Sequence, residues 1–199
     1  MKLAEVLTSD IPAAQKVVSY LIREIMRNTF EHTDMDHLWI AAQRHNSEKY
    51  IEVAIADNSV GIKQVICVNP DLRAQITSDE SALRFAVKPG VSGNAKRSKD
   101  TSYWANSGYG LYVTKELLKK VGLFVLISGD AYLYANDMKM DVIHHGNFHG
   151  TMAYLRFDID KISNIDDNSI NDIVKTGERE SSSDASAVNV ASKASKRFF

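Results

Sequence analysis

The longest regular pattern in this sequence is a helical one near its start. Asp10 is of a residue type that caps helices, and Pro12 suits a first helical turn. Apolar side chains then recur at the spacing of one helical face, at Val18, Leu21, Ile22, Ile25 and Met26, with Thr29 extending the row. The pattern predicts a long amphipathic helix from about Pro12 to His32.

Shorter elements follow this helix. Strands are predicted at His37–Arg44 and Tyr50–Asp57, and the turn-forming residues 46–49 predict that they pair as an antiparallel hairpin. Further helices are predicted at Ile62–Val68, Glu80–Val87 and Gly110–Val121, and short strands at Leu123–Ser128, Ala131–Tyr134, Met138–His144 and Thr151–Asp158. Between Lys88 and Asn106, Gly, Ser, Lys and Asn dominate, which predicts a long irregular loop of a kind that is often functional.

Length and composition favour one domain with a tail. With 199 residues and 44% hydrophobic content, the chain can bury one sizeable core and has no room for a second full domain. After Ile162 small and polar residues dominate, and no aromatic residue occurs between Phe157 and Phe198. Such a segment buries too little apolar surface to offset its ordering entropy. We expect a domain over residues 1–162 and a mostly disordered tail over Ser163–Phe199.

The net charge gives no support for two kinds of partner, and the cysteine count excludes two kinds of site. The formal net charge of −1 gives no overall reason to expect nucleic acid or a membrane surface. The single cysteine, Cys67, excludes an internal disulfide and a multi-cysteine zinc site. The sequence has neither the apolar core of a signal peptide nor an apolar run that could span a membrane. These features predict a cytoplasmic protein.

A polar row runs along the predicted first helix. Glu24, Asn28 and His32 recur at every fourth residue, which advances about 40° per step and keeps all three in one stripe. A stripe of this kind is most often a solvated helix surface, so on its own it does not indicate a site.

The strand at residues 50–57 ends in a carboxylate on its apolar face. Alternation places Ile51, Val53, Ile55 and Asp57 on the same side. A buried carboxylate needs a hydrogen-bond donor, and the exocyclic amine of adenine is a suitable one. An equally good interpretation is that Asp57 starts a turn with Asn58.

Two further segments combine glycine with a regular element. Gly108-Tyr109-Gly110 opens a predicted helix, where free backbone N–H groups and the helix dipole favour a phosphate, although many such segments are only turns. Gly150-Thr151 opens a strand on which Thr151 shares a face with Ala153, Leu155 and Phe157. The Thr151 hydroxyl is therefore predicted to lie in the same interior layer as Asp57.

Together the four segments resemble, in order and in structural context, the N, G1, G2 and G3 boxes of the GHKL superfamily of ATPases, over about Ile11 to Asp158. This superfamily includes gyrase, heat-shock chaperone ATPases, histidine kinases and mismatch-repair ATPases. The resemblance implies an α+β fold, a two-layer α/β sandwich whose mostly antiparallel sheet is covered on one face by helices. The Glu24, Asn28 and His32 form of the N box is most similar to that of stand-alone anti-sigma-factor serine kinases and related bacterial regulatory ATPases.

The resemblance also implies roles for individual residues. Asn28 would help to bind Mg²⁺ at the triphosphate of ATP, and Glu24 would act as the general base. Asp57 would accept a hydrogen bond from the adenine amine with support from Thr151, and Gly61 would let the backbone pass close to the base. The remaining nucleotide-binding positions would be Lys88, Gly108, Tyr109, Gly110 and Leu111, with the two glycines presenting backbone amides to the phosphates.

The loop Lys88–Asn106 resembles the mobile ATP lid of the superfamily. Its basic residues Lys96, Arg97 and Lys99 could reach the γ-phosphate when the lid closes, although charges in a loop are usually only solvated. One departure concerns the G1 box, where Ser59 stands in place of a glycine. If the backbone there needs a positive φ, Ser59 would cost on the order of 1 kcal/mol.

Two functions remain open at this level. One is an ATPase or protein kinase in a bacterial-type regulatory system, with a protein partner or substrate. The other is a non-catalytic module that senses ATP and thereby controls binding to a partner protein. A DNA-acting, gyrase-type ATPase would need a transducer domain for which the chain has no room, and a homodimer remains open.

Overall fold

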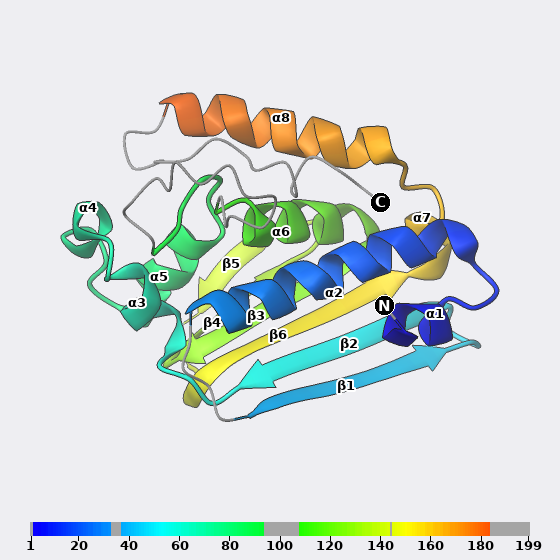
Figure 1. The fold of residues 1–199 in the computed structure, drawn as a ribbon, viewed down its shortest axis with the longest axis horizontal. Helices are drawn as coiled ribbons and strands as arrows, with labels where there is room; N and C mark the ends of the chain where they lie inside the picture. Colours follow the sequence, from blue (N-terminus) through cyan, green and yellow to red (C-terminus); the bar gives the residue numbers. More distant parts are fainter. Residues whose placement is uncertain (1, 33–36, 94–107, 144, 184–199) are drawn as a thin grey trace.

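The computed structural model describes residues 2–32, 37–93, 108–143 and 145–183 (Figure 1). Its helices are α1 (Lys2–Leu7), α2 (Pro12–His32), α3 (Gly61–Ile66), α4 (Pro70–Arg73), α5 (Asp79–Ala86), α6 (Gly110–Val121), α7 (Ile159–Ile162) and α8 (Asp167–Ser183). Its strands are β1 (Leu38–His45), β2 (Tyr50–Asp57), β3 (Gly122–Gly129), β4 (Ala131–Ala135), β5 (Met140–Ile143) and β6 (Phe148–Asp158). No helix in these ranges is both long and apolar enough to cross a membrane.

The strands form one twisted sheet. Within the described residues its order is β1-β2-β6-β3-β4-β5, and every pairing is antiparallel. β6 therefore lies between β2 and β3, although it is the last strand of the described residues. This arrangement places Asp57 of β2 and Ser128 of β3 in register with Thr151 of β6, on either side of it. Three polar residues thus share one end of the inner face.

Alternation along the strands decides which face is buried. Ile51, Val53 and Ile55 of β2 are buried, and the residues between them are half-buried. Leu155 and Phe157 of β6 continue the buried face beside β2. The helices cover this face (Figure 1). The predicted α+β class, with a largely antiparallel sheet covered on one face by helices, is confirmed.

The helical layer is built from α2 and α6, which run across the sheet side by side (Figure 1). α2 presents its apolar residues to the strands, as the spacing from Val18 to Ile25 predicted. The shorter α3 and α5 pack over the β3 and β4 side of the sheet. α5 begins with a capping box in which Ser78 accepts from Ser81 N and the Ser81 hydroxyl accepts from Ser78 N, so its start is fixed locally.

The segment after Ile162 differs from the sequence prediction. Disorder was expected from Ser163 onward, but Asp167–Ser183 forms α8, which lies along the outer side of α6 (Figure 1). Ile170, Ile173 and Val174 are buried and join the main core. The polar composition hides a narrow apolar stripe, because residues 170, 173, 174 and 177 share one helical face. Residues 184–199 lie outside the described part.

Candidate functional site

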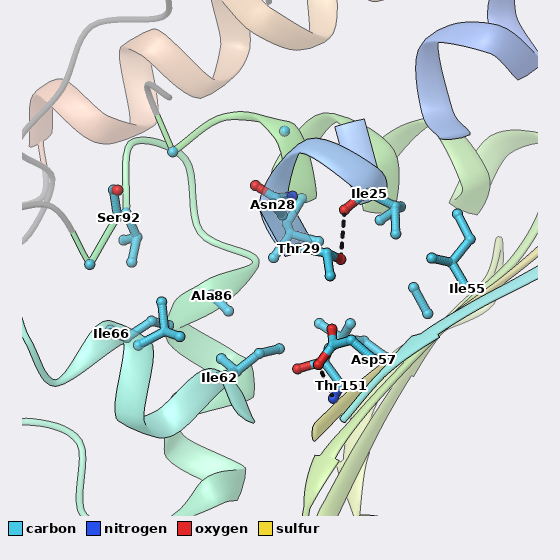
Figure 2. Close-up of a pocket in the computed structure, with 18 residues that line it drawn as sticks. Ile25, Asn28, Thr29, Ile55, Asp57, Ile62, Ile66, Ala86, Ser92 and Thr151 are labelled. Carbon is cyan, nitrogen blue, oxygen red and sulfur yellow. Dashed lines mark hydrogen bonds between the residues drawn. The ribbon is translucent and has the colours of Figure 1, made fainter. Parts of the chain in front are cut away.

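A pocket opens between the helical layer and the end of the sheet that carries Asp57. Its empty space is about 760 Å³, part of it open to solvent. Residues of α2, α3, α5 and the start of α6 line it together with the inner face of β2, β3 and β6 (Figure 2). Its walls are mainly apolar, and polar side chains are contributed by Asn28, Thr29, Asp57, Ser92 and Thr151. A concave apolar site with a few placed polar groups is the usual form of a small-molecule pocket.

Asp57 lies on the sheet wall of this pocket. Its side chain is 3% exposed. Its Oδ1 accepts from the backbone N of Ser59 at 3.0 Å, from the Ser59 hydroxyl, and from the backbone N of Thr151 at 3.2 Å. Oδ2 receives no hydrogen bond from any of the described residues. One oxygen of a buried carboxylate is thus fixed by the protein, and the other is left for a donor within the pocket.

Ser59 plays a different part from the one that the sequence suggested. Its backbone does not adopt a positive φ, so the strain expected for a serine in place of glycine does not occur. Its side chain is buried and donates to Asp57. The turn interpretation and the binding interpretation of Asp57 are therefore compatible, because the turn bonds use one carboxylate oxygen only.

Thr151 and Ser128 complete the polar row on the sheet. Thr151 lines the pocket beside Asp57, as the alternation along its strand predicted (Figure 2). Ser128 is buried, accepts from Ile62 N at 2.9 Å and donates to Gly150 O at 2.9 Å. It thereby ties the start of α3 to the sheet. Gly61 begins α3 and packs against Ser128, and it does not line the pocket, although its neighbour Ile62 does.

The opposite end of the pocket is formed by α2 and the start of α6. Asn28 lines the pocket from α2, across from Asp57 (Figure 2). Gly108 and Gly110 line it at the start of α6, as does Leu111. Within the described part, no side chain caps the N-terminus of α6. Its first N–H groups and the helix dipole are therefore directed toward this end, where an anion is favoured.

Both glycines at the start of α6 lie very close to neighbouring atoms. Gly108 has φ 73°, and a methyl group on it would lie 2.3 Å from the carbonyl oxygen of Val91. A methyl group on Gly110 would lie 2.7 Å from Glu24 Oε2 and 3.5 Å from Asn28 Nδ2. The absence of a side chain at position 110 thus lets α6 approach the polar residues of α2 closely.

Glu24 is not on a solvated surface. Its side chain is fully buried, and Oε2 accepts from Arg27 Nη2 at 2.6 Å. Arg23 Nη2 lies 3.6 Å from Oε1. Glu24 itself does not line the pocket but lies directly behind Gly110. Glu24 is therefore buried where α2 packs against α6, so the solvated-surface alternative does not hold for this residue.

The side chains of two predicted binding residues do not line the pocket. Tyr109 is buried, its hydroxyl is hydrogen bonded to Ser181 Oγ of α8 at 2.8 Å, and burial raises the pKa of its phenol. The Lys88 ammonium lies over the Phe85 ring, 4.5 Å from its centroid. Neither residue lines the pocket. The lid residues Lys96, Arg97 and Lys99 lie outside the described residues.

The residues present fit Mg²⁺ only as a companion of a bound nucleotide. Among the described residues, no group of three or more His, Cys, Asp or Glu side chains could hold a metal ion. Asn28 could offer one amide oxygen at the end of the pocket beside α6. Mg²⁺ prefers six oxygen ligands and usually keeps several waters and phosphate oxygens among them. The remaining ligands would have to come from the triphosphate and from water.

Arg27 lies next to the pocket, behind Gly110, and was not predicted from the sequence. In the sequence it resembles any solvated arginine on a helix surface. In the structure it is only 9% exposed and is paired with Glu24. The available signal was its position three residues after an acidic residue, a spacing at which helical side chains meet. The pairing explains how a charged Glu24 can be buried, since an isolated buried carboxylate costs on the order of several kcal/mol.

Comparisons with known proteins show a structural likeness only. No family model and no curated protein matches the sequence. Solved structures that match include the ATPase region of Saccharomyces cerevisiae topoisomerase II bound to ICRF-187 (dexrazoxane), with 16% identity and a TM-score of 0.42. A second structure of that region has 17% identity and a TM-score of 0.41. Each match covers 80% of this chain and 42% of that chain, so the present chain spans about two fifths of their length.

Proposed function

We propose that this chain is a Mg²⁺-ATP-binding domain of the GHKL type that acts as an ATPase or protein kinase in a bacterial-type regulatory system. One observation carries the proposal. Asp57 is buried in the wall of an apolar pocket with Oδ1 fixed by three protein donors, and Oδ2 receives no hydrogen bond from the described residues. A flat heterocycle with an amine is the ligand chemistry that satisfies such a carboxylate.

Adenine fits this requirement, and guanine does not, when the 6-position of the base faces Asp57. The 6-amino group of adenine is a donor, whereas guanine carries a carbonyl oxygen at that position, which a carboxylate repels. Ile55, Ile62 and Leu126 line the same pocket and would contact the faces of the base. The Thr151 hydroxyl, beside Asp57, would support the same hydrogen bond directly or through water.

The phosphates would extend from this base toward α6. Gly108 and Gly110 would offer backbone amides at the helix N-terminus, and Asn28 would bind the accompanying Mg²⁺. The metal would neutralise phosphate charge and help to hold the terminal phosphate for transfer. Glu24 lies next to Gly110 and would accept a proton from water or from a substrate hydroxyl.

The test uses γ-labelled ATP with Mg²⁺. Equilibrium binding of ATP and GTP is measured first, and we expect ATP to bind at least about 10-fold more tightly because one charged hydrogen bond contributes roughly 1.5–3 kcal/mol. Free phosphate and label transferred to co-purified proteins are then measured separately. Equal affinity for ATP and GTP would overturn the adenine assignment, and transferred label would distinguish a kinase from an ATPase.

A second candidate function is an ATP sensor without appreciable turnover. The observation that favours it is the 2.6 Å ion pair between Glu24 and Arg27, which engages one of the two carboxylate oxygens of Glu24. Such a module would bind ATP and change its affinity for a protein partner. Tight ATP binding without released or transferred phosphate, even with partner proteins present, would favour this function.

The cellular setting belongs to the same proposal. A single cysteine fits a reducing compartment, so we place the protein in the cytoplasm. The resemblance of the N box to that of anti-sigma-factor serine kinases makes a protein the expected partner or substrate.

A further inference from the structure

The Glu24 and Arg27 ion pair lies at the point where α2 meets the start of α6. Arg27 Nη2 donates to Glu24 Oε2 at 2.6 Å, and both side chains are nearly or fully buried. A methyl group on Gly110 would lie 2.7 Å from that same oxygen and 3.5 Å from that same nitrogen. The pair is therefore directly adjacent to the helix N-terminus at which we place the phosphates.

The pair lies beyond the pocket rather than in its wall. Gly110 and Asn28 line the pocket, whereas Glu24 and Arg27 do not. A ligand whose base is at Asp57 must therefore extend past Gly110 before it can reach Arg27. In a nucleoside triphosphate the terminal phosphate is the group farthest from the base.

We propose that Arg27 senses the terminal phosphate and holds Glu24 until that phosphate arrives. This inference rests on the proposed function, since it takes ATP as the ligand. In the nucleotide-free protein the Arg27 guanidinium binds Glu24 Oε2. When ATP is bound, the guanidinium binds the terminal phosphate, and Oε2 is released to accept a proton from the attacking hydroxyl or water.

The exchange is favoured by the chemistry of the groups. A guanidinium presents paired N–H donors that match phosphate oxygens, and a phosphate carries more charge than a carboxylate. The buried guanidinium retains an anionic partner in both states. The released Glu24 carboxylate keeps one cation nearby, because Arg23 Nη2 lies 3.6 Å from its Oε1. ADP lacks the group that would complete the exchange, so Arg27 would contribute little to its affinity.

Competition between Glu24 and the phosphate for Arg27 predicts a specific mutational pattern. Glu24→Gln weakens the ion pair and should tighten ATP binding relative to ADP. Arg27→Met should weaken ATP binding by about 10-fold or more, the value of one charge-assisted hydrogen bond, and should leave ADP binding almost unchanged. In the double variant Glu24→Gln/Arg27→Met, the gain from Glu24→Gln should disappear, because Arg27, for which Glu24 and the phosphate compete, is absent.

The experiment measures equilibrium binding of ATP and ADP with Mg²⁺ to the full chain and these three variants. Arg84→Met is the matched control, because Arg84 also pairs with a glutamate on a helix, Glu80 at 2.9 Å, but in an exposed position. It should leave the ratio of ATP to ADP affinity at the wild-type value. Thermal melting checks that each variant is folded.

The outcomes separate this inference from the proposed function. If the wild-type protein binds no adenine nucleotide, the proposed function fails. If it binds ATP but Arg27→Met weakens ATP and ADP equally, or the Glu24→Gln gain persists without Arg27, the sensing role is wrong and the proposed function stands. Should Arg27→Met not fold, Arg27→Lys replaces it, since it keeps the charge and loses the paired donors; it should lower the preference for ATP, and an unchanged preference contradicts the inference.

Discussion

At the scale of single residues, Asp57 offers the most direct test of ligand identity. Asp57→Asn keeps an oxygen for the bonds from Ser59 and Thr151 but turns the second oxygen into an NH₂ donor. The variant should lose its preference for ATP over GTP, with ATP affinity lowered by about 10-fold or more. Competition binding with both nucleotides measures this ratio. A preserved ratio would show that Asp57 only closes the turn.

Ser59→Ala is the companion variant for this prediction. It removes the hydroxyl that donates to Asp57 Oδ1 and leaves the backbone donors of Ser59 and Thr151 in place. The carboxylate remains, so the ATP preference should survive with a smaller loss of affinity. A loss as large as that of Asp57→Asn would mean that carboxylate positioning, rather than its charge, determines selectivity.

Glu24 and Asn28 lie one turn apart on α2, and substitutions of the two residues should impair different properties, turnover and Mg²⁺-dependent binding. Glu24→Gln keeps the size of the side chain but removes the proton acceptor, so any turnover should fall by roughly 10²-fold or more while ATP still binds. Asn28→Ala should instead weaken the Mg²⁺-dependent part of binding, because one oxygen ligand is lost. Turnover assays and binding assays with and without Mg²⁺ distinguish the two. Unchanged turnover in Glu24→Gln would remove Glu24 from catalysis.

At the scale of elements, the start of α6 depends on the absence of a side chain at position 110. A methyl group there would lie 2.7 Å from Glu24 Oε2, closer than packed atoms allow. Gly110→Ala should destabilise the fold by about 1–3 kcal/mol through forced separation of α2 and α6, and should weaken ATP binding as well. Chemical denaturation and nucleotide titration measure the two effects. Lys120→Ala, on the exposed side of the same helix, is the control, and equal stabilities of the two variants would contradict this account.

The elements also show what sequence periodicity can and cannot predict. α2, β2, β3 and β6 were predicted because their apolar residues repeat at a local period that a single element must satisfy. The same alternation placed Asp57 and Thr151 on one buried face. The burial of the Glu24 and Arg27 pair was not predicted, because burial of that side of α2 depends on where α6 docks. That packing arises from the tertiary fold and has no local pattern.

At the scale of the whole molecule, α8 decides where the domain ends. Its buried residues Ile170, Ile173 and Val174 join the main core, and Ser181 is hydrogen bonded to Tyr109 at the start of α6. α8 therefore connects the end of the described chain to α6, whose first residues line the pocket. The segment was taken for a tail because its average composition is polar, whereas its stability depends on a few correctly spaced residues.

Truncation after Ile162 tests the contribution of α8. Burial of three aliphatic side chains is worth at most about 1.5–3 kcal/mol each, so their removal should lower the free energy of unfolding by several kcal/mol and expose the outer side of α6. Truncation after Ser183 is the matched control, because it retains every described contact of α8. Thermal melting and ATP binding are measured for both proteins. Since Tyr109 adjoins the two glycines of the site, the shorter protein should also bind ATP more weakly; if it melts and binds like the control, α8 is an accessory to the domain and the domain boundary lies at residue 162.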